Sequence, residues 1–178
     1  SVRRILQVKY DLGLFNHEVP TLADYPDFAS DAHHALALES AKESIVMLRN
    51  EDVLPLKKDA KILLAGPNAN DLNALNGGWT RTWQGTDPTY NTPGRNGLFD
   101  AMKNSGARVE LFEGIASTFA SRAKNFDAVV LAVGEKPYTE TPGDIESLDL
   151  PQEQLDLIRT AGELNVPVVL MLIEGRPR

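Results

Sequence analysis

Two patterns of apolar residues divide the chain near residue 60. Before this point, apolar residues recur every three or four positions, as they do along one face of a helix. After it, short apolar runs of strand length alternate with segments of helical spacing. We therefore predict a helical first part, residues 1–60, and a second part, residues 61–178, in which strands and helices alternate.

The first part is predicted to hold two helices. The first begins with the apolar residues Val2 and Leu6 and ends at Gly13, because glycine readily terminates helices. The second follows Ser30, which is a suitable N-cap, and its apolar stripe extends the predicted helix to about Asn50.

The second part is predicted to hold four strands. They are the segments KILLAG (61–66), RVELFEG (108–114), DAVVLAVG (127–134) and PVVLMLI (167–173). Helical segments lie between them, at 94–106, 116–125 and 151–164. Strands that alternate with helices form a mostly parallel sheet with helices on both faces, so the predicted fold class is α/β, a three-layer α/β/α sandwich.

Two connections are longer than a link between a strand and a helix requires. One follows the first predicted strand, over 67–90, and the other follows the third, from Glu135 onward. Parallel sheets bind ligands at the loops that leave the carboxyl ends of their strands. Long loops at such ends therefore indicate function.

The first long loop contains both tryptophans of the chain, Trp79 and Trp83, and the glycine pair Gly77 and Gly78. A tryptophan in a polar, glycine-rich loop either anchors the loop or offers a flat surface to a ligand. For two tryptophans, we expect one of each role.

The second long loop places several carboxylates directly after a buried strand. Glu140 lies between Pro137 and Pro142, which stiffen the loop, and a general acid must be held within hydrogen-bond reach of its acceptor. Glu135 is closer to the strand and is expected to bind backbone donors. With Tyr138 nearby, this pattern predicts a carboxylate–aromatic site for a hydroxyl-rich ligand.

Composition excludes several classes of function. The net charge of −7 argues against nucleic acid as the main partner, and no apolar run approaches the roughly 20 residues that span a bilayer. There is no cysteine, and the adjacent His33 and His34 point in different directions on a helix, so we expect no metal site and no cofactor. Because the chain begins inside a helical pattern and ends after an apolar strand, we expect it to be a fragment.

Motifs along the whole chain resemble glycoside hydrolase family 3, of the β-glucosidase and exo-β-glucanase type. SVRRILQVKYDLGLF is similar to the last helix of the family's (β/α)8 barrel, and ALESAKESIVMLRNEDVLPL to the connector that follows it. Signatures of the family's second domain follow in order: KILLAGPNA, GGWTRTWQG, GEKPYTETPGD, LPQEQLDLI and EGRP.

The resemblance implies that two domains each supply one of the catalytic carboxylates. Residues 1–60 would be the last barrel helix and the connector, and 61–178 an incomplete copy of the second domain, docked on the mouth of the missing (β/α)8 barrel. That barrel carries the nucleophilic aspartate of a retaining hydrolase. Within the matching motifs, Glu140 would be the acid/base, Trp83 would clamp the sugar, and Trp79 and Tyr138 would contact substrate.

The implied activity is removal of β-linked glucose from the non-reducing end of β-glucosides or β-glucans, in a periplasmic or secreted enzyme. The fragment alone should be inactive. The alternative is a non-catalytic carbohydrate-binding or structural domain in which Glu140 is merely solvated. A nucleotide-binding domain is disfavoured, because GPNAND after the first strand lacks the glycines of a phosphate-binding loop.

Overall fold

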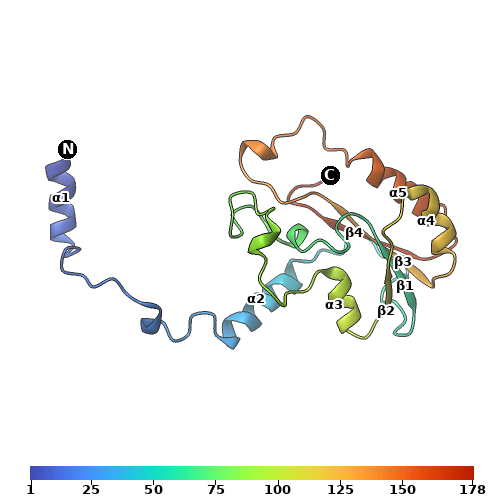
Figure 1. Cartoon of the computed structure of the whole chain (residues 1–178), viewed down its shortest axis with the longest axis horizontal. Coiled ribbons are helices and arrows are strands. Elements are labelled where there is room, and N and C mark those ends of the chain that lie inside the picture. The colour runs from blue at the N-terminus through green and yellow to red at the C-terminus, as the bar shows by residue number, and fades with distance from the viewer. The chain divides into compact units, whose positions relative to one another are not determined.

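The computed structural model describes residues 1–178 and divides them into two compact units, Ser1–Arg49 and Asn50–Arg178 (Figure 1). The first unit is helical, and all the strands lie in the second. None of the helices combines the length and the apolar character needed to cross a membrane.

The first unit contains α1 (Val2–Asp11), a short 3-10 turn (Leu22–Asp24) and α2 (Asp31–Ser44). The predicted N-cap is confirmed, because the Ser30 hydroxyl accepts a hydrogen bond from the backbone N–H of His33 at 3.4 Å. The predicted end of α2 near Asn50 is wrong, since Ile45 already has an extended backbone. Two β-branched residues in succession, Ile45 and Val46, disfavour helix, and α2 buries no side chain that would offset this cost.

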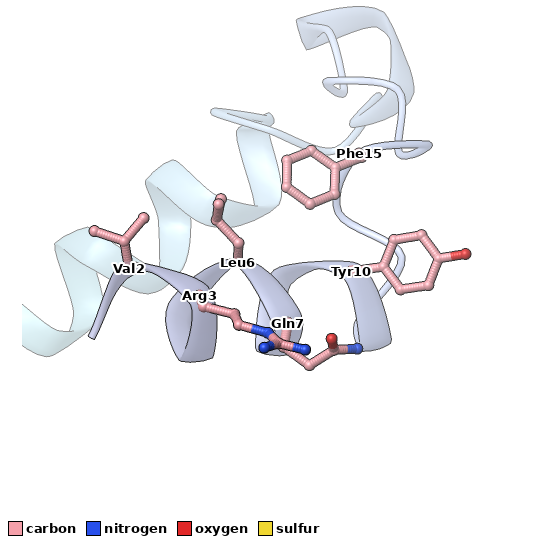
Figure 2. A pocket seen from close by; sticks show the side chains of 6 residues that line it. All are labelled: Val2, Arg3, Leu6, Gln7, Tyr10 and Phe15. Atoms are coloured by element: carbon pink, nitrogen blue, oxygen red, sulfur yellow. The ribbon is translucent and has the colours of Figure 1, made fainter.

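The side chains of α1 remain open to solvent within the first unit. Val2, Leu6 and Phe15 line a shallow cavity of about 490 Å³ together with polar neighbours (Figure 2). The apolar face of this amphipathic helix is therefore not covered by its own unit.

The second unit is built on a four-stranded sheet with the order β2-β1-β3-β4, in which every neighbouring pair is parallel. The strands are β1 (Lys61–Ala65), β2 (Arg108–Leu111), β3 (Ala128–Gly134) and β4 (Val168–Ile173). The helices are α3 (Leu98–Asn104), α4 (Ala116–Ala123) and α5 (Gln152–Gly162). The predicted strands, helices and α/β class are confirmed.

Helices cover both faces of this sheet, as Figure 1 shows, because the central strands bury side chains on both sides. On one face, Leu131 and Val133 of β3 pack with Phe119 of α4 and Leu157 of α5. On the other face, the buried residues Leu64 and Val130 pack with the partly buried side chains of α3. The central strands therefore read as continuous apolar runs in the sequence.

Candidate functional site

The two long loops leave neighbouring strands at the same edge of the sheet. From β1 the chain crosses to β2 on one side, and β3 lies on the other side of β1, so the strand order reverses between β1 and β3. In open α/β sheets, ligands bind at such a reversal, outside the carboxyl ends of the strands. The loop after β1 and the loop after β3 both begin here, which makes this edge the candidate site.

Each of the two loops begins at a glycine that lies very close to the backbone of a neighbouring strand. Gly66 directly follows β1 and has a φ of +103°, and a Cβ there would collide with the backbone of Ala132 in β3. Gly134 ends β3 with a φ of +134°, and a Cβ there would collide with the backbone of Ile173 in β4. Only glycine lets these chain segments approach so closely.

The first loop presents both indoles to solvent. Trp79 donates its backbone N–H to the carbonyl oxygen of Trp83 at 2.8 Å, which closes a turn around the residues between them. The side chains are 67% and 47% exposed, respectively, so neither is enclosed by the unit. The division of roles between the two tryptophans stays a prediction. Neither indole is buried, and hydrogen bonds and close glycine contacts hold this loop.

Farther along the same loop, Asp87 caps a short 3-10 turn, Pro88–Tyr90. Hydrogen bonds from the Thr89 hydroxyl and from its backbone N–H lower the pKa of the Asp87 carboxyl. A polar cavity of about 530 Å³ lies beside this turn, and Arg81 and Arg95 contribute its charged side chains.

Gln84 joins the two loops. Its side-chain oxygen accepts the backbone N–H of Thr139 at 3.0 Å, and its side-chain nitrogen donates to the carbonyl oxygen of Thr139 at 3.1 Å. Gly78 packs against the same segment: a Cβ there would come 2.6 Å from the Thr139 Cβ and 2.7 Å from the Tyr138 carbonyl oxygen. The residue after Trp83 is thus paired with the residue before Glu140.

Replacing Gln84 with alanine is expected to loosen the second loop locally. The two lost hydrogen bonds contribute roughly 1 kcal/mol each, so exchange of the Thr139 amide hydrogen should accelerate by about 10- to 30-fold. Hydrogen exchange followed by NMR measures this directly, with the amides of β3 unchanged. Gln152→Ala is the matched control, because Gln152 bonds only to Asp156 on the exposed face of α5. Unchanged protection of the Thr139 amide hydrogen in Gln84→Ala would contradict the role assigned to Gln84.

Glu140 has an unusual backbone. Its φ of 56° and ψ of −150° place it near a region of conformational space that non-glycine residues avoid, and it precedes a 3-10 turn, Thr141–Gly143. The backbone N–H of Gly143 donates to the Glu140 carbonyl oxygen at 2.9 Å. Its side chain is exposed and makes no hydrogen bond or ion pair within the chain. A free carboxylate is thus held at the tip of a loop by backbone contacts.

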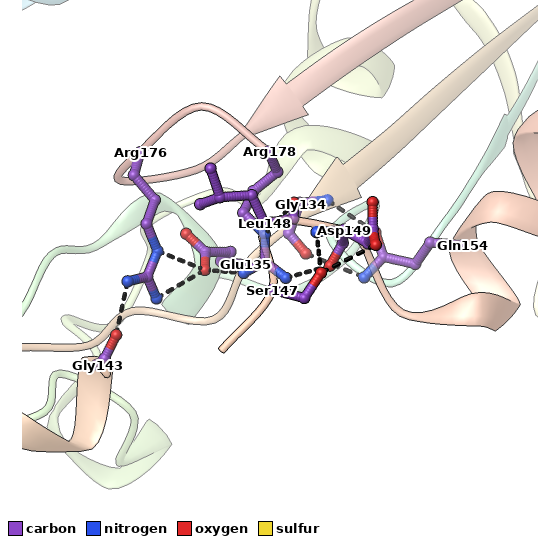
Figure 3. Close-up of polar contacts among 9 residues, drawn as sticks. All are labelled: Gly134, Glu135, Gly143, Ser147, Leu148, Asp149, Gln154, Arg176 and Arg178. Carbon is purple, nitrogen blue, oxygen red and sulfur yellow. Dashed lines mark hydrogen bonds and ion pairs between the residues drawn. The ribbon is translucent and has the colours of Figure 1, made fainter. Parts of the chain in front are cut away.

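Glu135 forms a buried ion-pair cluster with the segment after β4 (Figure 3). Its Oε1 accepts from Nε of Arg176 at 3.1 Å and also pairs with Arg178, and its side chain is only 8% exposed. The expectation that Glu135 binds backbone donors is wrong. The two arginines, which follow β4 at the same edge of the sheet, take this carboxylate instead.

A second glutamine fixes the start of the same loop. Gln154 of α5 accepts the backbone N–H of Gly134 at 2.8 Å and donates to the carbonyl oxygen of Gly134 at 2.9 Å (Figure 3). The segment from Gly134 to Thr139 is therefore clamped by a glutamine amide at each end. Sequence inspection missed Gln84 and Gln154, because their partners are backbone groups that leave no trace in the side-chain pattern.

Tyr138 lies half-buried between the loop and the segment after β4. The guanidinium carbon of Arg176 is 4.2 Å from the centre of the Tyr138 ring, and a Cβ at Gly175 would come 3.0 Å from the Tyr138 hydroxyl. One face of the ring is thus occupied within the chain. Its predicted contact with substrate stays a prediction.

The sequence-predicted site residues lie on the two connected loops: Trp79, Trp83, Tyr138 and Glu140. No group of three or more histidine, aspartate or glutamate side chains is arranged to hold a metal ion. The edge offers an exposed carboxylate, two exposed indoles and polar loop surface. Such a set suits proton transfer to, and stacking on, a hydroxyl-rich molecule.

Residues 45–178 match the family model described as the glycosyl hydrolase family 3 C-terminal domain. A lysosomal beta glucosidase of Dictyostelium discoideum is 34% identical over 100% of this chain, which spans 24% of that protein. A beta-xylosidase of Formosa agariphila is 33% identical, and a periplasmic beta-glucosidase of Salmonella typhimurium is 30% identical, each over 99% of this chain. The chain spans 26% and 28% of their lengths, about a quarter in each case.

Solved structures give the same relationship. The exo-1,3/1,4-beta-glucanase of a Pseudoalteromonas species matches with a TM-score of 0.72 and 31% identity, covering 96% of this chain and 22% of that one. The beta-glucosidase of Listeria innocua in complex with glucose matches with a TM-score of 0.71 and 31% identity, covering 95% of this chain and 24% of that one.

Proposed function

This chain belongs to glycosyl hydrolase family 3, whose C-terminal domain it carries in residues 45–178, and from this premise we propose that it supplies the proton donor of a β-glucosidase-like hydrolase. Glu140 is the proposed donor. The observation that carries this proposal is its placement: a solvent-exposed carboxylate without a partner in the chain, at the tip of a loop held by two glutamine clamps.

The proposed reaction retains the configuration of the sugar and uses two carboxyl groups about 5 to 5.5 Å apart. First, a nucleophilic carboxylate attacks the anomeric carbon, the glycosidic bond breaks, and Glu140 gives its proton to the leaving oxygen. Then Glu140, now ionised, takes a proton from water as the water oxygen attacks the glycosyl-enzyme, and the nucleophile is released.

The nucleophile is proposed to lie on another domain, the (β/α)8 barrel that the family resemblance implies. Residues 1–60 are proposed to be the last barrel helix and the connector, with 61–178 the second domain. The open apolar face of α1 supports this assignment, because Val2 and Leu6 of the helix, and Phe15 in the turn that follows it, are exposed within their own unit. A packed barrel would cover such a face.

Trp83 and Trp79 are proposed to provide flat surfaces for the sugar on the leaving-group side. Both indoles are exposed, and the hydrogen bonds between Gln84 and Thr139 join their loop to the Glu140 loop. Indole faces stack well on the apolar faces of sugar rings, while ordered loop positions limit the entropy lost on binding.

The proposed substrate is a β-glucoside or β-glucan oligosaccharide, cleaved at its non-reducing end. Relatives named beta glucosidase and the Listeria complex with glucose support this class, and the relative named beta-xylosidase makes β-xylosides the sugar to compare. A periplasmic or secreted location is proposed, supported by the relative named periplasmic beta-glucosidase.

The test is hydrolysis of an aryl β-glucoside by the full-length protein, with the configuration of the first-formed sugar read by NMR. We expect the β-anomer to appear first, and we expect the 178-residue chain alone to show no turnover, because it supplies a proton donor without a nucleophile. Turnover by the isolated chain would contradict the proposed division between domains. Binding of β-glucans without hydrolysis by the full-length protein would favour the alternative, a non-catalytic carbohydrate-binding domain.

A further inference from the structure

Arg176 lies where it can control the position of Glu140, and we propose that it is a positioning residue for the acid/base. This inference rests on the proposed function of Glu140. It assigns to the segment after β4 a role in holding a carboxylate that lies on a different loop.

The guanidinium of Arg176 contacts the Glu140 loop at three places, of which Figure 3 shows those at Glu135 and Gly143. Its Nε and Nη2 lie 3.1 Å and 3.0 Å from Oε1 of Glu135, before Glu140 in the loop. Its Nη1 donates to the carbonyl oxygen of Gly143, after Glu140, at 2.6 Å. Its face lies over the ring of Tyr138, with 4.2 Å to the ring centre. One planar group thus ties together both sides of the loop tip.

The contact with Gly143 reaches Glu140 through a single residue. While the Gly143 carbonyl oxygen accepts from Arg176, the Gly143 N–H donates to the carbonyl oxygen of Glu140 at 2.9 Å. A Cβ at Gly143 would come 3.0 Å from Cε2 of the Tyr138 ring, so the turn, the ring and the guanidinium are packed in succession. A shift of Arg176 therefore moves the turn that closes on Glu140.

The backbone of Glu140 makes this support necessary. A non-glycine residue in such a conformation is strained and persists only where the surroundings hold it. A planar fork suits this task, because it directs several N–H groups at fixed angles, which the single ammonium of lysine does not do.

Arg178 provides the internal comparison. It pairs with the same Oε1 of Glu135, but its other partners are the carbonyl oxygens of Leu148 and Asp149, at the far end of the loop. Removal of Arg176 leaves Glu135 paired with Arg178, so the buried carboxylate keeps a cation. Loss of Arg176 should therefore disturb the loop tip more than the fold.

The experiment compares Arg176→Ala, Arg176→Lys and Arg178→Ala in the full-length protein, on aryl β-glucosides with good and poor leaving groups. Misplacement of a reacting group by about 1 Å costs on the order of 10²-fold, so Arg176→Ala should lower kcat/KM, which reports formation of the glycosyl-enzyme, on the poor leaving group by about that factor. A dinitrophenyl β-glucoside, whose good leaving group departs without a proton, should lose far less of its kcat/KM. Arg176→Lys should recover part of the loss, and Arg178→Ala should lower the thermal midpoint without this selectivity.

Equal losses on both substrates, or the same selectivity in Arg178→Ala, would overturn the proposal, since a purely structural role gives either result. If Arg176→Ala does not fold, Arg176→Lys carries the test on the same pair of substrates, and an unselective loss there overturns it. Glu140→Ala, measured in parallel, distinguishes a failure of the positioning role of Arg176 from a failure of the acid/base role of Glu140. Selectivity in Glu140→Ala but not in the Arg176 variants rejects the positioning role alone, whereas no selectivity in Glu140→Ala rejects the proposed function itself.

Discussion

Replacing Glu140 with alanine in the full-length protein is expected to slow hydrolysis of β-glucosides with poor leaving groups by about 10²- to 10⁴-fold or more, the usual contribution of a positioned acid/base. Substrates with good leaving groups should still form the glycosyl-enzyme, because their departure needs no proton. That intermediate should then accumulate. Added azide should restore turnover, since it attacks the anomeric carbon without giving up a proton, and the product should be a β-glycosyl azide.

Glu146→Ala is the matched control for this experiment. Glu146 is an exposed carboxylate of the same loop and makes no hydrogen bond or ion pair within the chain, so its loss should change neither rate nor product. Glu135 is unsuitable as a neutral control, because its buried carboxylate pairs with two arginines. If Glu140→Ala slows good and poor leaving groups equally and yields no azide product, Glu140 binds sugar or supports the loop.

The largest expected loss of stability follows from Phe119→Ala. Phe119 of α4 is fully buried and meets the ring of Phe112 edge to face, with 5.3 Å between ring centres. Truncating a buried phenylalanine removes its transfer free energy and leaves a cavity, which together cost about 3–5 kcal/mol. The free energy of unfolding of the second unit, measured by circular dichroism in guanidinium chloride, should fall by this amount.

Phe28→Ala tests whether the loss depends on burial. Phe28 is 68% exposed in the first unit, so its truncation should leave the unfolding of the second unit unchanged. A loss below about 1 kcal/mol for Phe119→Ala would mean that α4 moves inward and fills the space, as some core sites do.

The sheet could be predicted from sequence because its signal is local. The run from Ala128 to Gly134 is apolar at nearly every position, as expected for a parallel strand covered on both faces, and glycine ends it. The end of α2 was harder to place. Apolar spacing continues past Ser44, but helices end where tertiary packing no longer supports them, and the sequence pattern does not report packing.

The candidate site was predictable only in part. Two loops at neighbouring strand ends, with tryptophans on one and Glu140 on the other, follow from the order of elements. The contacts that fix them do not. Arg176 is 41 positions from Glu135 in the chain, and the glutamine clamps bind backbone atoms, so neither relationship appears in residue spacing. The one available signal was the pair of arginines after β4, at the edge that also holds the carboxylates.

At Glu140, the positive φ of the backbone lowers stability, while the side chain that occupies this position carries the proposed activity. Glycine adopts this conformation without strain, so Glu140→Gly should relieve a local cost of about 1–3 kcal/mol while removing the carboxylate. Alanine keeps the strain and loses the same group. Selection for thermal resistance alone would therefore favour glycine here, and we expect a glutamate to persist at this position only if its carboxylate contributes to turnover, as proposed.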